Sequence, residues 1–188
     1  MRFSLSTNWN VERHEKGEAL ADEILSLGFD ALEVGYHATE ELAAGIRRRV
    51  NAGAVAVDSV HAYCPVPVGA PHGYPELYLL ASLDEDERAM ASILIGRTLS
   101  FAESMGARAV VLHAGRVFLK SFFGELHTRT LVDALSEEGA VDAPRYQRLF
   151  AKALRRRASR VGKYYDGFCL SLDALLPKFE KAGVTLCL

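Results

Sequence analysis

Hydrophobic and polar positions follow two alternating patterns along the 188-residue chain. Five short, mostly apolar runs are each bounded by turn or helix signals, which is typical of β-strands. Their near-continuous apolar character favours strands buried on both faces, as in a parallel sheet. The predicted strands cover residues 2–6, 31–35, 55–61, 109–113 and 184–188.

Helical periodicity fills most of the chain between these strands. Residues 18–27 place apolar side chains three and four positions apart before Gly28, and Thr39 is a suitable N-cap for a second helix. A run of four acidic residues opens a long predicted helix over 84–105, where carboxylates complement the helix dipole.

The last predicted helix covers residues 170–182 and contains Pro177. A proline inside a helix removes one backbone hydrogen bond, so we expect either a kink or a true start near Leu175.

Residues 116–169 form a less regular insertion between the fourth strand and the last helix. Within it, the pattern predicts partial helix over 118–135, a loop over 137–144 and a helix over 145–163. Insertions of this kind on α/β scaffolds often carry function, and we expect this one near the active site.

Alternating strands and helices indicate one α/β domain over residues 1–188, built from parallel units with right-handed crossovers. The pattern alone does not separate an open, doubly wound sheet from a barrel. The first strand-to-helix turn lacks G-x-G-x-x-G, and the chain has no G-x-x-x-x-G-K-[ST]. Dinucleotide-binding and P-loop functions therefore lose support.

Charge and composition exclude several protein classes. The chain has 22 Lys and Arg against 24 Asp and Glu, a net charge of -2, and a pI of about 6.3, unlike a dedicated nucleic-acid-binding domain. No run reaches the roughly 18 apolar residues of a membrane span, and residues 1–16 turn polar too soon for a signal peptide, so none is expected. Three cysteines without C-x-x-C spacing argue against a disulfide framework, so we expect a reducing, cytoplasmic setting.

Three polar residues stand at the carboxyl ends of predicted strands, where parallel α/β folds bind their ligands: Glu33, His61 and His113. These three residues are the candidates for substrate binding. Imidazole can also bind a metal or move protons near neutral pH. The alternatives are a structural, hydrogen-bonded role for each histidine and a salt bridge from Glu33 to a neighbouring strand, which we favour for Glu33. Cys64 follows the third strand, and we expect it to serve in packing.

A basic run without acidic residues lies between residues 143 and 165. It predicts either a phosphate-binding face or a solvated helix paired with the acidic stretches at 84–87 and 137–138, and the second interpretation is favoured. Interleaved tyrosines could stack on bases or form the inner edge of the helix. The residues are Arg145, Arg148, Lys152, Arg155, Arg156, Arg157, Arg160 and Lys163, with Tyr146, Tyr164 and Tyr165.

A series of motifs resembles the xylose isomerase-like TIM barrel superfamily, which includes sugar phosphate isomerases/epimerases and AP endonuclease family 2. The motifs are GFDALEVGY at 28–36, SVHAY at 59–63, LASLDEDER at 80–88, MGARAVVLHAG at 105–115 and KAGVTLCL at 181–188. The resemblance implies a (β/α)8 barrel of which about the first five strands, its N-terminal part, are present. A complete barrel typically needs about 250 residues.

The resemblance also implies a divalent metal (Zn, Mn, Mg or Co) at the barrel mouth. His61 and His113 are similar to the third- and fourth-strand histidines that bind zinc in the endonuclease branch, although HAYCP at 61–65 departs from the usual H-x-P-Y. In the isomerase branch most metal ligands are carboxylates on strands five to eight, which we expect beyond Leu188. The catalytic residues are therefore unknown, and this chain is expected to hold an incomplete metal site or no metal.

Three functions follow. The first is a sugar (phosphate) isomerase or epimerase, with metal-dependent proton transfer on a hydroxy-ketone or aldose in the complete barrel. The second is an AP endonuclease-like repair phosphodiesterase, which the near-neutral charge disfavours. The third is a non-catalytic half-barrel completed by a partner chain, such as a second copy pairing through exposed sheet edges. The expected ligand is a small sugar or sugar phosphate, with no membrane partner.

Overall fold

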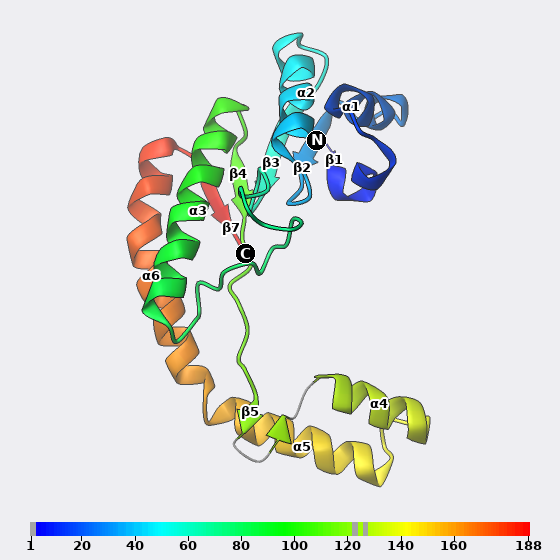
Figure 1. Cartoon of the computed structure of the whole chain (residues 1–188), viewed down its shortest axis with the longest axis vertical. Coiled ribbons are helices and arrows are strands. Elements are labelled where there is room, and N and C mark those ends of the chain that lie inside the picture. Colours follow the sequence, from blue (N-terminus) through cyan, green and yellow to red (C-terminus); the bar gives the residue numbers. More distant parts are fainter. Residues whose placement is uncertain (1–2, 122–123, 126–127) are drawn as a thin grey trace.

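Five parallel strands form one sheet at the centre of the molecule (Figure 1). The computed structural model describes residues 3–121, 124–125 and 128–188. All five predicted strands are confirmed, each somewhat shorter than expected, and Arg2 lies outside the described residues. The strands are β1 Ser4–Ser6, β2 Ala31–Val34, β3 Ala56–His61, β4 Ala109–Val111 and β7 Thr185–Cys187.

The order of the strands in space decides between the two architectures that the sequence pattern leaves open. It is β1-β2-β3-β4-β7, the same as their order along the chain, and every neighbouring pair is parallel. A doubly wound sheet reverses its strand order at a switch point, whereas a barrel adds each strand on the same side of the last. The sheet is therefore five consecutive strands of a β/α barrel.

Four helices cover one face of this sheet. Two short 3-10 turns, Thr7–Trp9 and Val11–Arg13, follow β1. The N-cap predicted at Thr39 is present, with its hydroxyl accepting from the Leu42 N–H at 3.3 Å. Asp84, predicted as the acidic start of the long helix, is its N-cap and accepts from the Asp86 and Glu87 N–H groups. The helices are α1 Gly17–Ser26, α2 Glu40–Asn51, α3 Glu85–Ser104 and α6 Val161–Ala182.

Helix α6 differs from its prediction. It begins at Val161 and continues through Pro177, so the expected start near Leu175 is wrong. Its buried side, which includes Gly167, Ser171, Leu175 and Phe179, keeps helical spacing across the proline and packs beside α3. That continuous packing offsets the one backbone hydrogen bond that Pro177 removes.

The two faces of the sheet differ in character. Toward the helices the strands place fully buried apolar side chains such as Leu32, Val60 and Val110. The alternate positions carry Glu33, Ser59 and other small or polar side chains that stay partly exposed. This second face corresponds to the interior of a barrel, and it is where a ligand can meet the strands.

The insertion forms a separate two-helix hairpin. Helices α4 (Thr128–Glu138) and α5 (Pro144–Ala158) pack on each other after a small β5–β6 ladder (Lys120–Ser121 and Gly124–Glu125) that the sequence did not indicate. The hairpin lies beyond the carboxyl ends of the strands, well away from the sheet (Figure 1). None of the helices in the described ranges has the length and apolar content needed to cross a bilayer.

Candidate functional site

Three aromatic rings meet where β2, β3 and β4 end. His61 is the last residue of β3, His113 follows β4, and Tyr36 follows β2. The ring centroids of His61 and His113 lie 5.2 Å apart, and Tyr36 lies 5.0 Å from His61. The structure thus brings together the two histidines that the sequence analysis placed at adjacent strand ends.

His61 presents one free ring nitrogen to this site. Its Nδ1 lies 3.0 Å from the Ala62 carbonyl oxygen, so Nδ1 carries the proton and donates. Nε2 is then the unprotonated acceptor. Burial lowers the pKa of His61 more than the Ala62 hydrogen bond and the charge of Glu33 raise it, with His113 adding to the decrease. His61 is therefore a neutral hydrogen-bond acceptor at pH 7.

Glu33 lies on the barrel-interior face of the sheet, one strand away from His61. Its Oε2 accepts from the Ser59 hydroxyl on β3 at 3.1 Å. Among the described residues Glu33 makes no ion pair, so the favoured interpretation of a salt bridge to a neighbouring strand is wrong. The partner on the neighbouring strand is the Ser59 hydroxyl. It uses one acceptor position of the carboxylate, so Glu33 can accept further hydrogen bonds.

A charged pair behind His113 was not anticipated from the sequence. Glu76 places Oε1 4.0 Å from His113 Nδ1 and Oε2 3.4 Å from a terminal nitrogen of Arg116. Arg116 follows the fourth-strand motif closely and could have been noticed there. Glu76 lies in an irregular segment between β3 and α3, where no local pattern marks it. Glu76 therefore places a carboxylate beside the His113 ring, and Arg116 holds that carboxylate from the other side.

The turn that carries Tyr36 is held by residues of the turn after β1. The Gly35 N–H donates to the Thr7 hydroxyl at 2.8 Å, and the Asn8 side chain packs directly against Gly35. A Cβ at position 35 would overlap the Asn8 side chain, so a larger residue there would displace Asn8. The polar turn after β1 thereby sets the position of the Tyr36 ring.

The residues present do not by themselves fit a catalytic metal. Catalytic zinc normally has three protein ligands, and His61 and His113 offer two ring nitrogens. Across the described ranges, no three histidine, cysteine, aspartate or glutamate side chains are grouped as a metal site requires.

Cys64 and the basic run between residues 143 and 165 were also singled out in the sequence. Cys64 is buried, and burial raises the pKa of its thiol well above the usual range, in line with the packing role. In the basic run, Arg145 pairs with Glu137, one of the two acidic stretches expected to pair with it. Of the interleaved tyrosines, Tyr164 is buried and Tyr165 is exposed.

Solved structures resemble this fold, whereas no protein-family model and no curated protein matches the chain. A D-tagatose 3-epimerase-like protein superposes with a TM-score of 0.59 at 16% identity, over 99% of this chain and 51% of its own. The chain therefore shares its fold, part of a TIM barrel, with this structure. Two further structures have TM-scores of 0.56. They are a 3-keto-D-glucoside 4-epimerase from E. coli (14% identity, 92% of this chain, 50% of its own) and a D-psicose 3-epimerase crystallised with D-fructose (13%, 100% and 52%).

The chain spans about half the length of these structures. The (β/α)8 fold with about five strands present, expected from the motifs, is confirmed. Identity of this level establishes the fold alone, and it assigns no substrate.

Proposed function

We propose that this chain forms the sugar-binding half of an isomerase- or epimerase-like barrel. The observation that carries the proposal is the group formed by Glu33, His61 and His113 at the carboxyl ends of consecutive strands, in a fold shared with sugar epimerases. A neutral imidazole and a carboxylate on one face suit the hydroxyl groups of a ketose or aldose.

Each residue has a distinct part in this proposal. His61 accepts a sugar hydroxyl through Nε2, because Nδ1 is occupied by the Ala62 carbonyl. Glu33 accepts a second hydroxyl, and Ser59 fixes its carboxylate. His113, oriented by Glu76, donates to or accepts from a third. The complete barrel is proposed to move a proton on a hydroxy-ketone or aldose with a divalent metal, whose donors the described residues do not supply.

Ligand-observed NMR tests the binding step. Saturation transfer from the full chain to D-tagatose, D-psicose and D-fructose is expected, and Glu33→Gln should weaken it about tenfold, because a hydrogen bond to a charged group is worth about 1.5–3 kcal/mol. Glu103→Gln is the matched control. Glu103 lies in the last turn of α3 and belongs to none of the strand ends, so this change should leave binding unchanged. Absence of transfer to all three ketoses would refute the proposal.

A phosphodiesterase of the endonuclease type is the second candidate. It is favoured by the two adjacent histidines and by Arg148, Lys152 and Arg155 on α5, which make no ion pair among the described residues. Zinc-dependent cleavage of a duplex with one abasic site would support this function. Failure to bind that duplex at low salt would exclude it, because phosphate contacts are strongest there.

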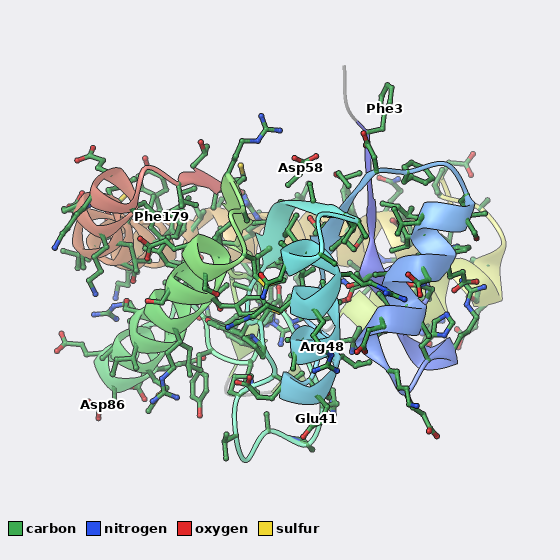
Figure 2. The ribbon with its side chains drawn as sticks, turned by 90° about the horizontal axis from the view of Figure 1, so that it is seen from above. Phe3, Glu41, Arg48, Asp58, Asp86 and Phe179 are labelled. Carbon is green, nitrogen blue, oxygen red and sulfur yellow. The ribbon has the colours of Figure 1, made fainter. Side chains whose placement is uncertain are left out.

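A partner that completes the barrel is the third proposal, and it is compatible with the first. Apolar hollows adjoin both edge strands: one of about 840 Å³ beside β1 is lined by Phe3, Leu5 and Leu27, and one of about 290 Å³ beside β7 is lined by Leu172 and Leu176. Phe3 is 65% exposed and extends away from the body (Figure 2). Open edges and exposed apolar side chains favour association. Light scattering should show a dimer or larger assembly that Phe3→Ser weakens, and a monodisperse monomer would contradict this proposal.

A further inference from the structure

A pocket separate from the strand-end site opens between the loop after β4 and the junction of α5 with α6. Its volume is about 450 Å³, within the range of small-molecule sites. Neither Glu33, His61 nor His113 lines it. Two arginines and three aromatic residues do: Arg116, Arg157, Tyr164, Tyr165 and Phe168.

The charge lining this pocket is positive. Arg157 makes no ion pair and no side-chain hydrogen bond within the described part of the chain. Arg116 contacts Glu76 at 3.4 Å through one terminal nitrogen, and its guanidinium lies over Phe118. No aspartate or glutamate lines the pocket. Two guanidinium groups facing one hollow without a carboxylate between them suit an anion, and their planar forks match phosphate oxygens.

Three aromatic residues line the pocket beside the arginines, and small or aliphatic residues complete its walls. Tyr164 is buried with its ring 6.3 Å from Phe118, whereas Tyr165 is 64% exposed at the rim. The Tyr164 hydroxyl makes no hydrogen bond to another described residue. Aromatic faces stack on flat rings, and a free hydroxyl adds one polar contact.

We propose that this pocket binds a small phosphate monoester that carries a flat aromatic ring, the chemistry of a nucleoside monophosphate. Arg116 and Arg157 bind the phosphate, and the ring stacks against Tyr164, Tyr165 and Phe168. The proposal does not depend on sugar binding at the strand ends, because Glu33, His61 and His113 do not line the pocket, although Arg116 also contacts Glu76 beside His113.

Calorimetry on the full chain tests the ligand class with four probes: AMP, adenosine, ribose 5-phosphate and inorganic phosphate. AMP is expected to bind at least about tenfold more tightly than each of the other three, because only AMP has both the phosphate and the ring. Equal affinity for AMP and inorganic phosphate would overturn the proposal, and so would the absence of AMP binding at millimolar concentration.

Matched variants test the residues. Arg157→Gln should weaken AMP binding about tenfold, whereas Arg155→Gln removes an equal charge from the same turn of α5, outside the pocket, and should leave binding unchanged. Equal losses from both variants would indicate diffuse helix charge and overturn the site. Tyr165→Ser should weaken AMP but not inorganic phosphate. The Tm of each variant without AMP shows whether a loss comes from unfolding, and Tyr165→Phe, which keeps the ring, should bind AMP as the unchanged chain does.

Discussion

The pKa of His61 is determined by its burial and by three neighbouring groups. Burial lowers its pKa, the Ala62 carbonyl and Glu33 raise it, His113 lowers it, and the net direction is downward. The unfolded chain, with a histidine pKa near 6.5, therefore binds more protons than the folded chain as the pH falls below that value. The contribution of His61 to stability is complete above about pH 6.5 and is lost as the pH falls toward its folded pKa.

Replacement of His61 by asparagine should reduce the loss of stability between about pH 7 and pH 5. Urea unfolding of both proteins across this range measures the difference, and NMR titration of the His61 ring should give a pKa below about 6.5. A His61 pKa above that value would contradict the expected lowering by burial.

The three cysteines should differ in reactivity. Cys64 is buried and burial raises its pKa, whereas Cys169 and Cys187 are partly exposed. A thiol-specific reagent at pH 7.5 is expected to modify Cys169 and Cys187 in the folded protein and Cys64 only after unfolding, because the thiolate is the reactive form. Peptide mapping after timed labelling measures this, with Cys64→Ser as the control. Early modification of Cys64 would show that its segment opens locally.

A site residue can be predicted from the sequence when it adjoins a recognisable apolar run. Glu33, His61 and His113 each end a recognisable apolar run, so their grouping could be predicted. Glu76 has no such context, and its contact with His113 exists only through tertiary folding. The partner of Glu33 was also misjudged, since register between strands, which places Ser59 opposite it, is not visible in a single strand.

At the scale of elements, α1 and α2 cross where two glycines meet. A Cβ on Gly45 would lie 2.7 Å from the Gly17 Cα and 2.7 Å from the Gly17 nitrogen, and it would also meet the Glu18 carboxylate. Gly45→Ala is therefore expected to lower the free energy of unfolding by about 1–2 kcal/mol, because overpacking exceeds the gain in helix propensity.

Gly96 provides the matched control inside α3, where a Cβ would meet no atom within 4 Å. Gly96→Ala should raise stability by about 0.5–1 kcal/mol through helix propensity alone. Urea unfolding of both variants measures the contrast. Stabilisation by both would show that α1 and α2 can separate without cost.

Element boundaries could be predicted where a capping residue or a glycine marks them. Thr39 and Asp84 begin α2 and α3 as expected. Pro177 gave the wrong start for α6, because packing across the proline outweighs one missing hydrogen bond. The β5–β6 ladder has two residues in each strand, too few for periodicity to register.

At the scale of the whole molecule, the order of strands in space is a property that no single segment encodes. Alternating patterns gave an α/β class, and only the motif series indicated a barrel. The sequential parallel sheet agrees with that resemblance. The pattern predicted helices in the region of α4 and α5. It did not predict that they pack on each other and lie away from the sheet, because that depends on tertiary contacts.

That separation predicts two units of different stability. The buried residues Ala134 and Ala153 belong to the hairpin and lie outside the main hydrophobic cluster, which joins the sheet to α1, α2, α3 and α6. Ala134→Asp places an unpaired charge in the hairpin, so amide protection should fall in α4 and α5 and persist in β3 and β4. Hydrogen exchange with mass spectrometry measures both regions. Val110→Ala, in the fully buried part of β4, is the converse control and should lower protection across the sheet. Equal loss in both regions from Ala134→Asp would mean that hairpin and sheet unfold as one.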